Sequence, residues 1–252
     1  MLRLIFKFAF FCIAFLSFNI KAQVINIENK RFLNDTNGWV GNIDFSFNIN
    51  QNTQQVLNFA NSCRVQYQYN RSRFIFLNDL NFIKAGNTNF VNSGYQHLRY
   101  NYKFTNRITM EVFTQTQYNP ILKLDFRYLL GYGPRFKLLK KPNARIYAAV
   151  LYMYEYDDIV GQKENYYENR ISSYLTFSFG LFKTVDLTST TFYQPNMANT
   201  ADYRIANDTG MEIHINKNLN FKTTFNMLYD TKQPPGIPDL VYIFRNGLSI
   251  KF

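Results

Sequence analysis

The chain has 252 residues, a formal net charge of +11 and two cysteines. Two cysteines exclude a disulfide-rich scaffold, and the sequence has no run of 18 apolar residues, which excludes a transmembrane helix. Aromatic residues, mostly Phe and Tyr, make up 18% of the chain. These residue types favour β-strands and membrane interfaces, so the composition indicates strands near a bilayer.

Residues 1–22 have the pattern of a secretory signal peptide. A basic start leads into the apolar run Phe8–Phe18, and Ala22 provides a small residue at the expected cleavage site. The eleven apolar residues are too few for a membrane anchor, which needs about 20. A lipoprotein signal is disfavoured because Cys12 lies inside the apolar run with no small residue just before it. We therefore predict an exported protein, cleaved after about Ala22.

Cleavage leaves a short N-terminal periplasmic tail, residues 23–38, ahead of the main domain at residues 39–252. The mature chain keeps one cysteine, Cys63, so it has no intramolecular disulfide, and it has 25 basic against 17 acidic residues. In the cytosol such a charge would raise nucleic acid as a partner, but export argues against nucleic acid. Outer-membrane lipid and lipopolysaccharide are the polyanions that an exported basic protein meets.

An alternation of apolar and polar side chains with a period of two predicts strands along the rest of the chain. It is clearest from Leu122 to Leu138, where every even position except Pro134 is apolar and the odd positions are mostly charged residues or glycine. These seventeen residues reach about 56 Å at about 3.3 Å each, enough to cross a bilayer at a tilt. Twelve strands are expected, at residues 39–50, 55–69, 73–85, 94–104, 108–118, 122–139, 144–156, 170–182, 185–195, 202–215, 219–230 and 241–252.

The connections between these strands alternate in length. The second connection and every later even-numbered one have four residues or fewer, whereas the seventh, at 157–169, has 13. Short turns at one end and longer loops at the other are typical of bacterial outer-membrane barrels. The predicted fold is therefore all-β: a transmembrane antiparallel up-and-down β-barrel of about 12 strands, at residues 39–252, in the bacterial outer membrane.

A soluble lipocalin-like barrel or sandwich would place the apolar face inward instead. This alternative is disfavoured because twelve strands enclose a lumen wider than side chains readily fill, whereas about eight close on a packed interior. Two segments, 74–83 and 146–154, are apolar on both faces for much of their length. Either the lumen has an apolar wall there, or another segment, such as the 23–38 tail, packs inside.

The last predicted strand carries large apolar side chains on one face and ends on an aromatic residue. This pattern resembles the terminal-strand signal by which the barrel-assembly machinery recognises outer-membrane barrels. We therefore expect that machinery to be a partner during biogenesis. The residues of this expected assembly signal are Tyr242, Phe244, Leu248, Ile250 and Phe252.

Three segments in the middle of the chain resemble a known family. His97–Asn101 reads HLRYN, Glu111–Gln117 reads EVFTQTQ, and Arg127–Arg135 reads RYLLGYGPR. They are similar to the salt-induced outer-membrane protein family, a domain-of-unknown-function group of bacterial barrels, in the form seen in Bacteroidetes-like sequences. The likeness covers about residues 55–252 and is most specific over 97–155. It implies an outer-membrane barrel of unassigned activity and supplies no catalytic residues.

The same block places polar side chains on the face opposite the apolar one. Because its three strands are consecutive, these side chains can meet in the lumen. An open path between them would make a narrow passive channel, or porin, for small solutes. We expect the other reading, in which the charges pair and fill the lumen, because buried charges need partners. The expected role is then envelope-structural and stress-related. The predicted lumen charge network is His97, Arg99, Glu111, Gln115, Gln117, Asp125, Arg127 and Arg135.

An outer-membrane lipid hydrolase is the remaining alternative. The two histidines are His97 and His214, and Ser93 is the serine nearest to His97 in the sequence. A nucleophile and its base must lie within hydrogen-bond reach, and the chain has no Gly-x-Ser-x-Gly motif. It also lacks a His-x-x-x-His motif and clustered Cys or His that would hold a metal. We therefore predict no catalytic residues, no cofactor and no metal site.

Overall fold

The computed structural model describes residues 37–51, 55–86, 88–162, 164–181 and 184–250. The signal peptide at 1–22, nearly all of the 23–38 tail and Phe252 lie outside the described residues. The described chain forms twelve strands and one short 3-10 helix, η2, at Pro120–Leu122. The strands are β1 Gly38–Gln51, β2 Gln55–Tyr69, β3 Ser72–Ala85, β4 Thr88–Lys103, β5 Ile108–Asn119, β6 Leu124–Lys141, β7 Ala144–Ile159, β8 Tyr166–Leu181, β9 Val185–Pro195, β10 Tyr203–His214, β11 Leu219–Asp230 and β12 Leu240–Ile250.

All twelve strands belong to one antiparallel sheet in which each strand pairs with the next along the chain. This is the up-and-down order, so the all-β fold class and the strand count are confirmed. Within the described residues, no helix is long and apolar enough to span a membrane.

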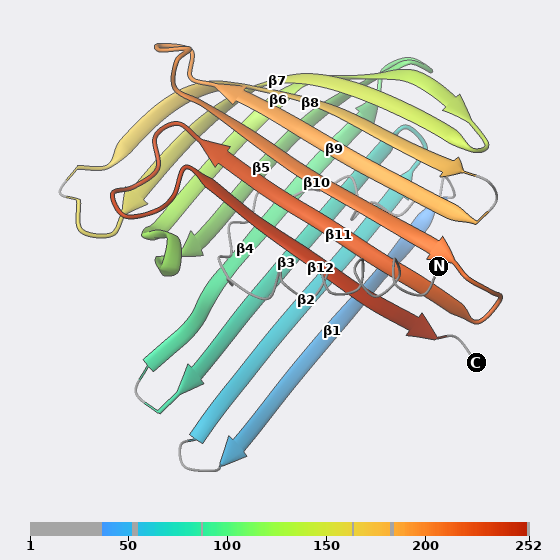
Figure 1. The fold of residues 1–252 in the computed structure, drawn as a ribbon. Helices are drawn as coiled ribbons and strands as arrows, with labels where there is room; N and C mark the ends of the chain where they lie inside the picture. Colours follow the sequence, from blue (N-terminus) through green and yellow to red (C-terminus); the bar gives the residue numbers. More distant parts are fainter. Residues whose placement is uncertain (1–36, 52–54, 87, 163, 182–183, 251–252) are drawn as a thin grey trace, which may run out of the picture.

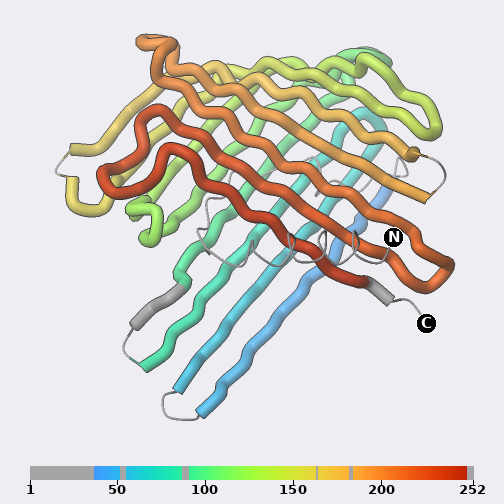
Figure 2. The backbone as a smooth tube through the Cα atoms, viewed as in Figure 1, coloured from blue at the N-terminus to red at the C-terminus, as the bar shows by residue number. Residues whose placement is uncertain are grey.

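The sheet coils into a barrel, as Figures 1 and 2 show. Contacts on the concave side require this curvature, because they join strands that are distant in the sheet. Tyr174 on β8 donates a hydrogen bond of 2.8 Å to Glu111 on β5, although β6 and β7 separate these strands in the sheet. The hydrogen-bonded order runs from β1 to β12, and no ladder between these two strands is found among the described residues.

The two faces of the wall differ in chemistry. On β6, Tyr132 and Leu138 point outward and are 56% and 60% exposed, whereas Gly131 and Gly133, on either side of Tyr132, face inward and are buried. Alternation along a strand requires this arrangement, so the face assignment made for β6 is confirmed over this stretch. The same pattern gives the convex side of the barrel a largely apolar, aromatic-rich surface.

The start of β6 differs from the prediction. Residues 120–122 form η2, and Lys123 adopts a left-handed backbone conformation with φ of 57°. Its N–H bonds the Pro120 carbonyl at 2.9 Å, which closes a turn and delays the strand to Leu124. A register shift between Leu124 and Phe126 follows. As a result Leu124 is buried and Asp125 is exposed, the reverse of the predicted alternation.

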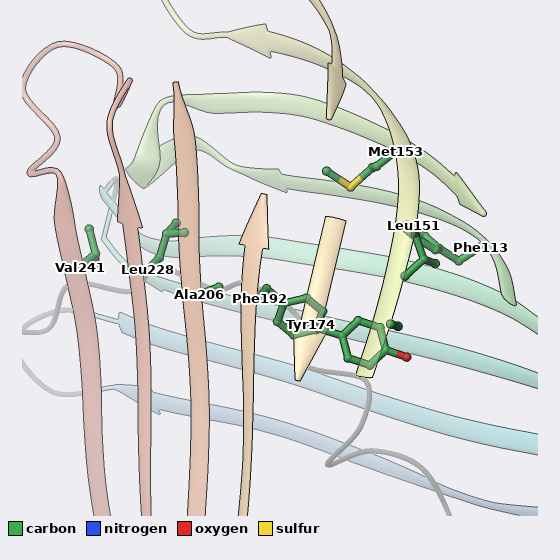
Figure 3. Close-up of a cluster of buried hydrophobic side chains, with 9 residues drawn as sticks. Phe113, Leu151, Met153, Tyr174, Phe192, Ala206, Leu228 and Val241 are labelled. Carbon is green, nitrogen blue, oxygen red and sulfur yellow. The ribbon is translucent and has the colours of Figure 1, made fainter. Parts of the chain in front are cut away.

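An apolar wall lines part of the interior and explains the segment 146–154. Its side chains come from β5 and from β7 to β12, and Figure 3 shows them on the inner side of the strands. A second, smaller cluster of Ile75, Leu77 and Tyr95 explains the segment 74–83 in the same way. An apolar wall is therefore present, and the other reading, in which the 23–38 tail packs inside, falls on residues outside those described. The main cluster consists of Phe113, Ala149, Leu151, Met153, Tyr174, Phe192, Ala206, Leu228 and Val241.

Candidate functional site

The first group of interior charges centres on Glu111 of β5, and we call it the Glu111 cluster. Glu111 is fully buried and forms an ion pair of 2.8 Å with Arg99 of β4, which is 4% exposed. Tyr174 of β8 donates a hydrogen bond of 2.8 Å to the same carboxylate. Arg135 of β6 lies 3.9 Å away. One buried carboxylate thus interacts with two cations and a hydroxyl group from three other strands.

A series of hydrogen-bonded polar side chains extends this cluster along β4 and β5. The Arg99 Nε donates to His97 Nε2 at 3.3 Å, and His97 Nδ1 lies 2.9 Å from Gln115 Oε1. Because Nε2 accepts, the proton is on Nδ1, which donates to Gln115, and the imidazole is neutral. Gln115 in turn donates to Gln117 at 2.7 Å. His97 and Gln115 meet because they are directly opposed in the β4–β5 ladder.

The second group of charges, the Glu155 cluster, connects β6, β7, β10 and β11. Arg127 and Asp157 are opposed in the ladder and form a two-pronged contact, with both hydrogen bonds at 2.6 Å. Arg204 of β10 reaches across the interior to Glu155 of β7. It also bonds Asp230 of β11 at 2.6 Å. Such bidentate arginine–carboxylate contacts are among the strongest polar contacts in proteins.

Arg170 of β8 links the Glu155 cluster to the loop end of the barrel. It lies 3.5 Å from Glu155 and donates to Asp202, in the β9–β10 connection, at 2.9 Å. Lys232 forms a second ion pair with Asp202, at 3.0 Å. Burial raises the pKa of Asp202, but its hydrogen bonds with Lys232 and Arg170 outweigh burial, and the pKa lies below its usual value.

Seven of the eight residues predicted for the lumen network lie on the inner side. Six of them belong to the Glu111 cluster and the polar side chains that extend it, and Arg127 belongs to the Glu155 cluster. The six are His97, Arg99, Glu111, Gln115, Gln117 and Arg135. Asp125 is the exception: it is exposed, so its assignment to the lumen was wrong. The physical reason is the register shift in β6 between Leu124 and Phe126, which leaves Asp125 without a ladder partner and breaks the alternation there.

Seven further residues of the two clusters were not predicted from the sequence; they come from β7, β8, β10, β11 and the β9–β10 connection. Glu155 and Asp157 occupy alternate positions of β7, so alternation could have placed them inward beside Arg127. The partners on β8 to β11 are separated from β7 in the sequence, and their contacts depend on the curvature of the whole sheet. The missed residues are Glu155, Asp157, Arg170, Tyr174, Asp202, Arg204 and Asp230.

A small cavity lies between the two clusters. It has a volume of about 70 Å³ and is lined by residues of both, including Arg99, Gln117, Arg127 and Glu155. This volume holds no more than a few water molecules. Larger cavities lie towards the two ends, about 300 Å³ at the loop end and about 290 Å³ at the turn end.

Neither histidine is arranged as a catalytic base for a serine. Both ring nitrogens of His97 are engaged by Gln115 and Arg99, and Ser93 is four residues away on the same strand. Four residues of strand span roughly 13 Å, far beyond hydrogen-bond reach. His214 contacts Asn220 at 2.8 Å and Asp186 at 3.0 Å. In the part of the chain that the structure describes, no group of His, Cys, Asp or Glu is placed to hold a metal ion.

The predicted assembly signal is only partly visible. Tyr242, Phe244 and Leu248 are exposed on the outer face of β12, as their alternation requires. The side chain of Ile250 and all of Phe252 lie outside the described residues. The role of these residues as a signal therefore stays a prediction.

The fold and its interior define the class of protein: a twelve-stranded up-and-down β-barrel whose lumen is crossed by paired charges. The chain belongs to the family described as "Protein of unknown function, DUF481", whose model matches residues 43–244. The family resemblance of the central segments is thereby confirmed.

Comparison with curated proteins gives no match. Among solved structures, the chain is similar to the NanC porin in a rhombohedral crystal form, with 11% identity, a TM-score of 0.47 and coverage of 77% of this chain and 94% of that one. It is also similar to the KdgM porin, with 9% identity, a TM-score of 0.41 and coverage of 85% and 99%. The KdgM porin in complex with disordered oligogalacturonate gives 11% identity, a TM-score of 0.40 and coverage of 77% and 93%.

Proposed function

We propose that the protein is a bacterial outer-membrane β-barrel that strengthens the cell envelope and whose lumen is closed by ion pairs. The observation that carries the proposal is the crossing of the interior by buried charges. Arg204 of β10 pairs with Glu155 of β7, and Tyr174 of β8 bonds Glu111 of β5. Each contact joins strands that are separated by two others in the sheet, so both bridge the concave side of the wall.

The apolar outer surface supports a membrane location. Large exposed hydrophobic side chains occur on strands all around the barrel, including Phe45 on β1, Leu130 on β6, Leu175 on β8 and Phe244 on β12. Soluble proteins rarely expose contiguous apolar patches larger than a few hundred Å². An apolar outer band is what a transmembrane barrel presents to lipid. Outer-membrane lipid and lipopolysaccharide are accordingly the proposed surroundings, and the barrel-assembly machinery the proposed partner in biogenesis.

The burial of the ion pairs supports a structural role for the lumen. An arginine or carboxylate that loses its partner in a buried pair destabilises a protein by about 3–5 kcal/mol. Such a network resists opening, because a path through it requires several of these pairs to separate. The few water molecules that fit in the cavity of about 70 Å³ between the clusters do not form a wide pore.

A narrow passive channel is the second candidate. The cavities of about 300 and 290 Å³ towards the two ends favour it, since they resemble chambers on either side of a constriction. In that case Arg127 and the neighbouring charges would select the solutes that pass.

Planar-bilayer recordings of the purified full-length protein separate the two functions. We expect no steady conductance from the wild type. Arg127→Ala combined with Arg135→Ala should leave carboxylates without their partners and lower thermal stability. The control pair Lys141→Ala and Lys217→Ala removes two exposed cations and should leave stability unchanged. A steady wild-type conductance whose anion preference disappears only in the Arg127 and Arg135 variant would establish the channel instead.

A further inference from the structure

The outer face of β2, β3 and β4 carries amide side chains at the height where a transmembrane barrel presents its apolar band. They are Asn61 of β2, Asn78 of β3 and Gln96 of β4, and we call them the amide patch. Each residue lies at or next to the middle of its strand. The three strands are neighbours in the sheet, as Figure 1 shows, so the amides form one group.

Burial and register place the amide patch on the outer face. Tyr95 and His97, on either side of Gln96, are 4% and 1% exposed, whereas Gln96 itself is exposed. Asn78 is directly opposed to Gln96 in the β3–β4 ladder, so the two side chains share a face. Asn61 lies on that face as well, since Asn78 donates a hydrogen bond of 2.7 Å to its side chain.

Apolar side chains lie beside the amide patch on the same face. Phe76 of β3 and Leu98 of β4 are each two residues from the amide of their own strand, and they are 39% and 49% exposed. Neither these side chains nor the amides carry a charge. In a bilayer such a surface faces hydrocarbon, where no water is present to bond an amide.

The hydrogen bonds of the amide patch are incomplete within the sheet. A primary amide has two N–H donors and an oxygen acceptor. In the part of the chain that the structure describes, no group bonds the side chain of Gln96. Asn78 uses one of its donors, for Asn61. Because an amide without a partner is costly in hydrocarbon, lipid is an unfavourable neighbour for this surface.

A second polar group on the outer face, on β9 and β10, differs because its side chains bond one another. It alternates along β10 with Ala206 of the inner wall. Asn207 donates to Thr191 and accepts from Thr209, both at 2.9 Å. Ser189 lies 2.7 Å from the Thr209 hydroxyl. These contacts satisfy the Asn207 amide without a second molecule, which the contacts within the amide patch do not do for Gln96.

We propose that the amide patch is the centre of an interface between two copies of this chain in the membrane. This inference rests on the proposed membrane location, and it holds whether or not the barrel conducts. Copies inserted in the same direction are related by a twofold axis along the membrane normal. Such an axis places a surface against itself, so mid-strand residues of one copy meet mid-strand residues of the other.

The chemistry of the amide patch suits a twofold interface. An amide is both donor and acceptor, so Gln96 of one copy is complementary to Gln96 or Asn78 of the other. The surface is neutral, so two copies do not repel each other through it. Phe76 and Leu98 supply apolar area around the amides, as the core of an interface requires. A second copy also presents its amides at the matching depth, because both barrels span the same bilayer.

Sedimentation equilibrium of the full-length protein tests the interface, in a neutral detergent whose density matches the solvent. We expect a reversible equilibrium between monomer and dimer. Asn78→Leu combined with Gln96→Leu should weaken dimerisation by about tenfold or more, because both copies lose their amide hydrogen bonds. Leucine suits a lipid-facing position, and gel migration with and without heating verifies that the variant barrel is folded.

The matched control is Asn207→Leu combined with Thr191→Leu. It replaces two polar side chains near the middle of outward-facing strands, on the β9–β10 side of the barrel. An unchanged dimer in this control, together with the loss in the patch variant, supports the interface. Equal losses in both variants, or a patch variant that dimerises like the wild type, would overturn it.

The state of the wild type and its location are scored separately. A wild type that sediments as a monomer at every concentration would overturn the proposal and leave lipid as the neighbour of the amide patch. Fractionation of cell membranes shows whether the chain reaches the outer membrane. A chain absent from that fraction contradicts the proposed function, whereas a monomer found there contradicts only the interface.

Discussion

Tyr174 of β8 donates a hydrogen bond to Glu111 of β5, although β6 and β7 lie between these strands in the sheet. The bond therefore crosses the concave side of the barrel. Its acceptor is a buried carboxylate that also holds Arg99 at 2.8 Å. Through this contact, the curvature of the wall depends on the charge of the Glu111 carboxylate.

The first prediction concerns that contact. Glu111→Gln leaves Arg99 buried without its carboxylate and should destabilise the barrel by about 3–5 kcal/mol. Tyr174→Phe removes one hydrogen bond to a charged group and should destabilise it by about 1.5–3 kcal/mol. Because both changes break the same contact, the double variant should lose less stability than the two single variants together. Urea unfolding in lipid vesicles measures all three.

A matched cycle with Tyr174→Phe and Asp230→Asn provides the control. Asp230 belongs to the Glu155 cluster and pairs with Arg204. These two changes should be additive, since residues without shared partners act independently. Additive effects for Glu111 and Tyr174 would argue that the bond across the interior contributes nothing to stability.

The second prediction compares two positions on the lipid-facing side of β6 that differ in their depth in the bilayer. Leu130 and Leu138 lie on the outer face of β6, the first near the middle of the strand and the second near its turn end. Leu130→Arg should destabilise the barrel by about 2–4 kcal/mol, and Leu138→Arg by about 0–1 kcal/mol. The strand, the face and the substitution are the same, so only the depth in the bilayer differs. Equal effects on heat-modifiable gel migration would contradict the membrane assignment.

The third prediction concerns the close approach of β6 and β7. A Cβ atom on Gly133 would lie 2.3 Å from the Val150 carbonyl oxygen, whereas a Cβ on Gly210 would have nothing within 4 Å. Gly133→Ala must therefore push two backbones apart and should lower stability by about 1–3 kcal/mol. Gly210→Ala should leave stability unchanged or raise it slightly. A Gly133→Ala variant with wild-type thermal stability would show that β6 and β7 can move apart without loss of stability.

The strand pattern could be predicted from the sequence because it depends on neighbouring residues. Alternation gave twelve strands whose limits mostly agree with the structure to within a few residues, and it placed Arg99, Glu111 and Arg127 on the inner face. Partners directly opposed in a ladder, such as His97 and Gln115, follow from the same rule. These features require only strand register, which the turns determine.

Two kinds of feature could not be predicted in this way. Asp125 was misplaced because the register of β6 shifts between Leu124 and Phe126, just after the turn that Lys123 ends, and a simple alternation does not show such a shift. The contact of Arg204 with Glu155 spans 49 residues and depends on how far the sheet has coiled. Alternation shows that both side chains face inward, but it does not show which inward-facing side chains meet.

The last prediction uses the titration of Asp202, which lies outside the strands. Its buried carboxylate accepts hydrogen bonds from Arg170 at 2.9 Å and from Asn196 at 3.3 Å, and it pairs with Lys232. Its pKa in the folded protein lies below the usual value of 3.8, because the contacts with Lys232 and Arg170 outweigh the effect of burial. The unfolded chain therefore takes up the proton more readily than the folded one. The stabilisation is complete above about pH 4 and is lost as the pH falls through the lowered pKa.

Asp202→Asn should remove this contribution. At neutral pH the variant should be less stable by about 1–3 kcal/mol, because two cations lose a charged acceptor. The difference between wild type and variant should shrink as the pH is lowered from about 4 to about 2, since the wild-type carboxylate becomes neutral as well. Thermal unfolding followed by circular dichroism at several pH values measures the difference. Asp239→Asn, at an exposed position of the connection that carries Lys232, is the control and should show no such trend. A stability difference for Asp202→Asn that stays constant down to about pH 2 would contradict the linkage to this carboxylate.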